Sequence, residues 1–219
     1  EVSAGDREAV EALAELMKRW VSQSSWVEEV PGDVRVDRQP NVMRRVHLYS
    51  GRGIDVRLHL FSDVSETLIH NHGASFYSSC LAGGYEHIFW MVDGNASKMH
   101  FRFNRSKSLE LDIPEPAPGG IKIAASTRHV QGLSYFISAD THHTVKASRD
   151  ERSKDPVMVV TMFIRGVDKM RDTVMLSREP KPDWGGMNRQ EEELRGAERI
   201  RALQDISSLV SGVGDEEEP

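Results

Sequence analysis

Short segments of alternating apolar and polar residues recur along the middle of this sequence, and they limit the fold more than any other feature. The clearest runs from Ile54 to Leu60, where aliphatic residues alternate with Asp55, Arg57 and His59, the pattern of a half-buried strand. Glycine-containing turns separate such segments. Many short strands without helices between them predict an all-β core, either an antiparallel sandwich or a barrel. The other predicted strands span residues 67–72, 75–82, 85–92, 98–103, 121–124, 133–138, 143–147 and 157–164, and the segment 112–119, with three prolines, is predicted to be a loop.

Both ends of the sequence have a helical pattern instead. Residues 6 to 22 place apolar side chains, including Val10, Met17 and Trp20, at spacings of three and four, which predicts an amphipathic helix. Residues 187 to 210 carry a less regular stripe of the same kind. We therefore divide the chain into an N-terminal helical segment (1–40), a barrel (41–168), a C-terminal extension with a helix (169–211) and a disordered acidic tail (212–219).

Charge and composition argue against several classes of function. A net charge of −6 argues against nucleic acid as a partner, because phosphate binding requires concentrated lysine and arginine. The longest nearly apolar run, Val157 to Ile164, is far shorter than the roughly 20 residues that cross a membrane. Cys80 is the only cysteine, so no internal disulfide can form. We expect a cytoplasmic protein in which this thiol is a small buried core residue.

Two closely spaced histidines, His70 and His72, are the strongest candidates for chemistry. They end a strand-like run, and residues two apart on a strand face the same way, so their imidazoles can bind one cation such as Fe(II), Zn(II), Ni(II) or Cu(II). A third ligand would come from His142 or His143. At most one of these two can reach the metal, because neighbours on a strand point to opposite faces. The alternative is that both are surface residues.

The residues around these histidines resemble a known family. The stretch Thr67 to Gly73, followed by Gly84 and then by His143 and Val145, resembles the cupin superfamily. More narrowly, it resembles the three-histidine, cysteine-dioxygenase-like (thiol dioxygenase-like) branch, because Arg45 precedes the histidine pair at the expected distance. The resemblance covers approximately residues 42 to 165, and the helices at either end lie outside it.

This resemblance implies a fold and a site. The fold would be a cupin barrel, that is, a double-stranded β-helix or jelly roll, with the helical segments as extensions. His70, His72 and His143 would hold Fe(II) as three neutral ligands, which leaves positions free for a substrate and O₂. Arg45 would bind a substrate carboxylate through two parallel hydrogen bonds, with Arg44 as the competing assignment.

The sequence departs from the family pattern at three places. Phe76 occupies the position where most cupins carry a glutamate ligand, and this points to the three-histidine branch. Tyr77 replaces the cysteine that some thiol dioxygenases crosslink to a tyrosine, and Cys80 is not in register to substitute for it. The late strand 157–164 contains neither histidine nor tyrosine, which argues against cysteine itself as the substrate.

Other polar residues near the histidine pair are weaker candidates. Glu66 or Glu86 would serve as a replacement fourth ligand, although a solvated turn residue is the simpler interpretation. Tyr77 would hydrogen-bond substrate or oxygen, or else be a core aromatic residue. The remaining histidines lack partner spacing and are treated as ordinary polar positions; they include His87, His100 and His129.

These residues support three hypotheses. The first is a mononuclear non-haem iron enzyme that oxidises a small thiol- or carboxylate-bearing metabolite with O₂, using Arg45 and Tyr77 beside the metal. The second keeps the site but uses Zn, Ni or Mn as a Lewis acid in an isomerase, lyase or hydrolase reaction. The third is a non-catalytic module whose terminal helices dock a partner. The partners expected are a small substrate and O₂, with neither nucleic acid nor membrane, and the chain is a possible homodimer.

Overall fold

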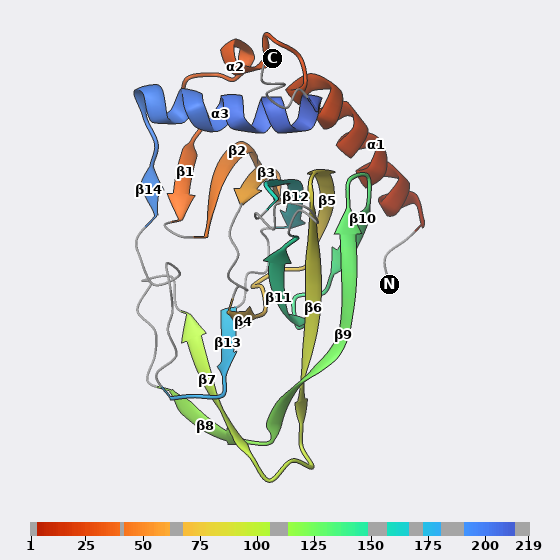
Figure 1. Ribbon diagram of the computed structural model, residues 1–219, viewed down its shortest axis with the longest axis vertical. Helices are drawn as coiled ribbons and strands as arrows, with labels where there is room; N and C mark the ends of the chain where they lie inside the picture. The colour runs from red at the N-terminus through yellow and green to blue at the C-terminus, as the bar shows by residue number, and fades with distance from the viewer. Residues whose placement is uncertain are drawn as a thin grey trace, which may run out of the picture.

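The computed structural model describes residues 4–39, 42–61, 68–105, 114–148, 157–166, 173–180 and 191–212, which form helices and two antiparallel β-sheets (Figure 1). The helices are α1 (Ala4–Val21), α2 (Trp26–Glu29) and α3 (Gly196–Ser211). The strands are β1 (Val36–Gln39), β2 (Met43–Gly51), β3 (Ile54–Phe61), β4 (Ile69–His70), β5 (Phe76–Ala82), β6 (Gly84–Asp93), β7 (Met99–Arg105), β8 (Glu115–Pro118), β9 (Gly120–Val130), β10 (Ser134–Ile137), β11 (His142–Ala147), β12 (Val159–Gly166), β13 (Thr173–Ser177) and β14 (Glu192–Glu193). Of the helices in these ranges, none is long and apolar enough to cross a membrane.

Eight strands form the centre of the fold, and their pairing is nested. Taken in chain order as β3, β4, β5, β6, β9, β10, β11 and β12, the first pairs with the last, the second with the seventh, the third with the sixth and the fourth with the fifth. The pairs alternate between two sheets, which we call sheet A (β10-β5-β12-β3) and sheet B (β4-β11-β6-β9). This is the arrangement of a jelly roll. The predicted all-β jelly-roll barrel with helices at its ends is therefore confirmed.

Six further strands widen the two sheets. β2, β1 and β14 continue sheet A beyond β3, and β13, β7 and β8 continue sheet B beyond β4. The prediction of a loop over 112–119 is wrong at Glu115–Pro118, which forms β8. Prolines are tolerated there because β8 is an edge strand, where a missing N–H group faces no partner. β13 lies in the segment assigned to a C-terminal extension, yet it pairs with β4 inside the sheet.

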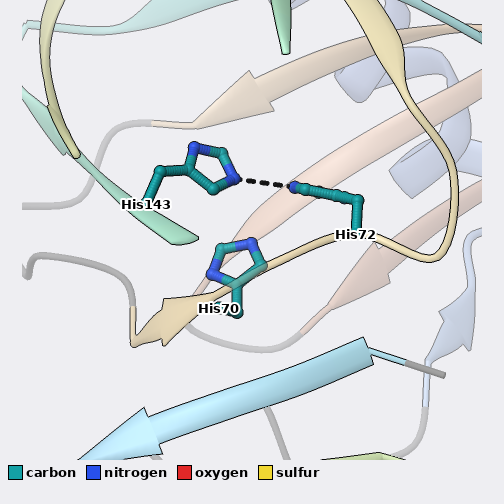
Figure 2. A group of neighbouring side chains, drawn as sticks. All are labelled: His70, His72 and His143. Carbon is teal, nitrogen blue, oxygen red and sulfur yellow. Dashed lines mark hydrogen bonds between the residues drawn. The ribbon is translucent and has the colours of Figure 1, made fainter. Parts of the chain in front are cut away.

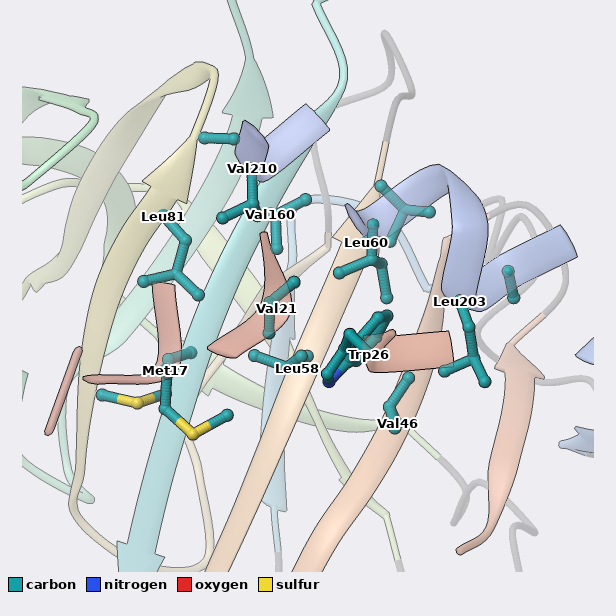
Figure 3. Close-up of a cluster of buried hydrophobic side chains, with 14 of the residues drawn as sticks. Met17, Val21, Trp26, Val46, Leu58, Leu60, Leu81, Val160, Leu203 and Val210 are labelled. Atoms are coloured by element: carbon teal, nitrogen blue, oxygen red, sulfur yellow. The ribbon is translucent and has the colours of Figure 1, made fainter. Parts of the chain in front are cut away.

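The helices cover the outer face of sheet A and close its main hydrophobic core (Figures 1 and 3). Leu58 and Leu60 of β3 pack there against Val21 and Trp26 from the N-terminal segment and Leu203 from α3. All five are at most 2% exposed, so this helix-covered core excludes water. The aliphatic half of the β3 alternation and the apolar stripes of both terminal helices thus meet in one core.

The inner faces of the two sheets meet through aromatic and polar side chains instead. The rings of Phe61 in sheet A and Tyr85 in sheet B lie 5.7 Å apart, and those of Phe76 and His143 lie 6.1 Å apart. Cys80 is buried in this layer beside Tyr85, as predicted, and burial raises the pKa of its thiol to about 12. We call this region the inter-sheet layer.

The predicted elements compare well with the observed ones in most places. The helix predicted over 6–22 is α1, and most of the predicted strands match strands within a few residues at each end. The predicted C-terminal helix begins later than expected, at Gly196, and residues 181–190 lie outside the described ranges. The predicted disordered tail also lies outside them, apart from Gly212.

Candidate metal centre

Three imidazoles converge where β4 pairs with β11 (Figure 2). One ring nitrogen from each of His70, His72 and His143 lies within 4.8 Å of the other two. The Nε2 atoms of His72 and His143 are 2.8 Å apart. Two imidazole nitrogens that share one ion at about 2.1 Å each lie about 3.0–3.4 Å from one another, so the observed spacing is close to that of a ligand pair.

The alternation of β11 explains which of its two histidines takes part. His143, Val145 and Ala147 point into the inter-sheet layer, where the latter two pack beside Tyr85. His142 is on the opposite face and is not a member of the three-histidine group. Of the two alternatives that the sequence left open, the structure therefore brings His143 to the other histidines.

The segment that carries His70 and His72 is fixed from the side by β13. Strand β4 consists only of Ile69–His70, so His72 lies in the loop segment that follows rather than on the strand as expected. Asn71 between them donates its backbone N–H to the carbonyl oxygen of Val174, and its side-chain oxygen accepts the N–H of Val174 at 2.6 Å. This two-way bond positions both imidazoles although the strand itself ends early.

Hydrogen bonds and burial set the protonation of these histidines. The Nδ1–H of His70 donates to the carbonyl oxygen of Leu68 at 2.6 Å, so Nε2 is the ring nitrogen that would coordinate a metal. Burial, followed by the nearby His70, holds the pKa of both His72 and His143 well below its usual value. The two side chains are therefore neutral at physiological pH, which is the state that binds a metal.

The sequence missed one residue of this site, His87. It lies fully buried on β6, and its Nε2 forms a short hydrogen bond with Nδ1 of His143. Burial, then the neighbouring His129, lowers the pKa of His87 to about 3. Its signal was the alternation of β6, in which Tyr85, His87 and Phe89 share the inward face, so that a histidine stands between two inward-facing aromatic residues.

Arg45 does not lie with the three histidines. Its guanidinium is 8% exposed and is held by two carboxylates, Asp37 at 2.7 Å and Glu191 at 2.7 Å. The competing residue, Arg44, forms an ion pair with Asp205 of α3. Both arginines thus have carboxylate partners within the protein, and these link β2 to β1 and to the C-terminal segment.

The other candidates are also directed away from the histidines, as far as they are described. Tyr77 is on the outer face of sheet A, where it packs on the helix-covered core and on Phe136. Glu86 is exposed on the outer face of sheet B and accepts a hydrogen bond from Ser126 at 2.6 Å. Glu66 lies outside the described residues.

An aromatic wall and a cationic pair flank the histidines on the side of sheet A. Phe76 packs against His72 and Phe163 with ring centroids 4.6 Å from each, and His59 stacks on the far side of Phe163 at 4.9 Å. Beyond this wall, Arg57 and Arg165 both contact the same oxygen of Asp55, at 2.5 and 2.9 Å. Two positive charges therefore share one negative charge.

The positive charge of Arg165 acts on the three-histidine group. After burial and His70, Arg165 is the next cause that lowers the pKa of His72. Burial is the main cause that lowers the pKa of Arg57, and the proximity of Arg165 adds to it against the opposing effect of Asp55. The Nε atom of Arg57 is buried and has no hydrogen-bond partner within the described ranges. This side of the layer therefore favours an anion.

No family model matches this sequence, and no curated protein is similar to it in sequence. Among solved structures, it is similar to an RmlC-like cupin from Shewanella frigidimarina (14% identity, 61% of this chain and 84% of that one, TM-score 0.35). It is also similar to the hydroquinone 1,2-dioxygenase PnpCD (11%, 57% and 64%, 0.34) and to the Drosophila melanogaster CENP-C cupin domain (10%, 73% and 98%, 0.39). Similarity this distant does not indicate a function. The assignment of the fold rests on the nested strand pairing described above.

The fold is a jelly roll of the cupin type with helices at its ends. Within this fold, the donor set itself fits a divalent metal: three imidazoles converge, and two of them have Nδ1 hydrogen-bonded so that Nε2 faces the centre. The three-histidine group could therefore hold a metal ion. Within the described part of the chain, the group includes no carboxylate.

Proposed function

We propose that this protein is a mononuclear non-haem iron enzyme that oxidises a small carboxylate- or thiol-bearing metabolite with O₂. The observation that carries the proposal is the convergence of His70, His72 and His143, with one nitrogen from each within 4.8 Å of the others. Three neutral ligands leave the full +2 charge on the ion and about three coordination positions open. Bound Fe(II) would supply the reaction with O₂, and the chain would supply position, charge and exclusion of water.

The residues around the histidines fit an anionic substrate. Arg57 and Arg165 share Asp55, so among the described residues one of their two positive charges has no carboxylate partner, and an arginine fork binds a carboxylate through two hydrogen bonds. We assign substrate binding to this pair instead of Arg45, because two carboxylates already hold the Arg45 guanidinium. Phe76 and Phe163 would shield the reacting end of the substrate from water.

A second candidate function rests on the same donor set. Three histidines are also a zinc ligand set in enzymes that activate water, so Zn, Ni or Mn would make this site a Lewis acid for an isomerase, lyase or hydrolase reaction. Such a reaction requires no O₂. We favour the oxygenase because a cytoplasmic compartment, inferred from the single buried Cys80, keeps iron in its ferrous state.

The test begins with protein purified anaerobically without a metal-chelating tag and loaded with Fe(II). We expect one iron per chain, and O₂ uptake with small thiols and carboxylic acids that is lost in His72→Ala. Arg165→Gln should keep the iron but raise KM for carboxylates at least about 10-fold, as expected for the loss of a charged hydrogen bond.

His142→Ala is the matched control, since this residue is next to a ligand but on the opposite face of β11. Stoichiometric zinc with turnover in the absence of O₂ would favour the Lewis-acid function. No metal bound by the wild-type protein, even after anaerobic loading, would contradict both.

A further inference from the structure

A second pair of buried histidines lies behind the metal centre. His87 contacts His143 on the ring nitrogen that faces away from the other two ligands, with ring centroids 4.6 Å apart. On its other side, the ring centroid of His87 is 5.4 Å from that of His129, and Tyr135 packs against both rings. His87 is 0% exposed and His129 is 6% exposed, so neither imidazole reaches bulk water.

The protons of these rings are linked. If His143 binds a metal through Nε2, its one proton is on Nδ1 and must be donated to Nε2 of His87. The proton of neutral His87 is then on its own Nδ1. Within the described residues, that Nδ1 has no hydrogen-bond partner, and neither ring nitrogen of His129 has one. Three buried polar atoms on neighbouring side chains are thus unpartnered.

We propose that His87 is a positioning residue for the metal ligand His143, and that His87 and His129 together bind one buried water. The His87 ring fixes the tautomer and the orientation of His143, while its Nδ1–H donates to the water and His129 supplies a second polar partner. A buried site with two to four polar partners is suited to one ordered water. The inference rests on the proposed function only in requiring that the three histidines bind a metal.

The experiment uses zinc as the probe, because Zn²⁺ is diamagnetic and needs no O₂. The Kd for zinc is measured by competition with a chromophoric chelator in the wild-type protein and in two variants of one position. His87→Phe fills the space but cannot accept the His143 proton, and we expect Kd to rise about 10- to 100-fold. His87→Gln carries an amide oxygen near the position of Nε2 and should recover most of this loss.

His100→Phe is the control for the removal of a buried histidine from sheet B. His100 is 3% exposed and donates Nδ1–H to the carbonyl oxygen of Gly119, and it lies on β7, two strands from β4 and outside the three-histidine group, so zinc affinity should stay unchanged. Nitrogen-15 NMR of the zinc-loaded protein gives a direct reading of the tautomers. We expect the proton of His87 on Nδ1. We also expect the chemical shift of the His87 Nδ1 to change in the His129→Phe variant.

The outcomes separate this inference from the proposed function. Zinc affinity of His87→Phe equal to that of the wild-type protein, or a His87 proton found on Nε2, would overturn the inference while the metal site stands. If the chemical shift of the His87 Nδ1 stays unchanged in His129→Phe, the proposal that the two histidines share a water is wrong. A wild-type protein that binds neither zinc nor Fe(II) would overturn both the inference and the proposed function.

Discussion

On strand β3, Leu58 and Leu60 point toward the helices, while Arg57 and His59 point toward sheet B. The first face is aliphatic, and its two leucines are at most 2% exposed under the terminal helices. The second carries ion pairs, an imidazole stacked on Phe163, and buried atoms such as Nε2 of His59 that have no hydrogen-bond partner in the part of the chain that the structure describes. One strand therefore contributes to two regions with opposite chemistry.

The two faces of β3 separate the residues that stabilise the fold from the polar residues beside the three histidines. Burying one leucine contributes roughly 1.5–3 kcal/mol, and the helix-covered core contains many such side chains. In the inter-sheet layer, burial of charged groups costs free energy that pairing offsets only in part. The polar side chains of the layer therefore contribute less to stability than the leucines do, which makes the two faces separable by mutation.

The largest effect on stability is expected on the aliphatic face. Leu58→Ala should lower the free energy of unfolding by about 3 kcal/mol, because it removes buried methyl groups and leaves a cavity. His59→Phe, one residue away, should change it by less than about 1 kcal/mol. The ring still stacks on Phe163, and the substitution removes a buried nitrogen that has no hydrogen-bond partner among the described residues. Urea unfolding of the two variants measures both changes in the free energy of unfolding. Equal losses would show that the two faces of β3 do not divide these roles.

The next effect concerns metal affinity and compares two faces of β11. His143→Ala should weaken metal binding by more than the roughly 10- to 100-fold that is typical of losing an outer partner, since it removes a proposed ligand. His142→Ala should leave the affinity within about 3-fold, because that side chain is outside the group. Isothermal titration with zinc measures both. A larger loss in His142→Ala than in His143→Ala would mean that the register of β11 differs from the one described.

Much of this division could be predicted from the sequence, because it depends on local alternation. The pattern from Ile54 to Leu60 predicted the strand, and the opposite directions of neighbouring strand residues limited the third ligand to one of two histidines. The contacts across the chain could not be predicted. Arg45 pairs with Glu191, which is 146 positions away, and β13 joins β4 through Asn71. Such partners leave no local pattern, since each side of the contact alone looks like an ordinary polar residue.

A smaller loss is expected from the ion pairs of the inter-sheet layer. Asp55→Asn removes the charge that two guanidiniums share, and it should lower the free energy of unfolding by about 2 kcal/mol. The loss should shrink in high salt, which screens the repulsion between Arg57 and Arg165. Glu193→Gln, at an exposed ion pair with Arg195, is the control and should cost less than about 0.5 kcal/mol. A salt-independent loss would indicate that Asp55 acts by packing rather than by its charge.

The smallest effect should appear in acid, at Asp37. Burial alone would raise the pKa of this carboxyl, but hydrogen bonds from His47 and Arg45 outweigh it and lower the pKa from 3.8 to about 2. Because the folded state binds this proton less tightly than the unfolded state does, the ion pairs contribute fully above about pH 4 and are lost as the pH falls toward about 2.

We expect about 1 kcal/mol from this titration, since Arg35, which also pairs with Asp37, is half-exposed and lets solvent screen the network. Free energies of unfolding measured between pH 5 and pH 2 should therefore fall less steeply in Asp37→Asn than in the wild-type protein. Parallel curves would mean that this carboxyl keeps an ordinary pKa. The layer between the sheets would then be as accessible to solvent near β1 and β2 as an exposed surface is.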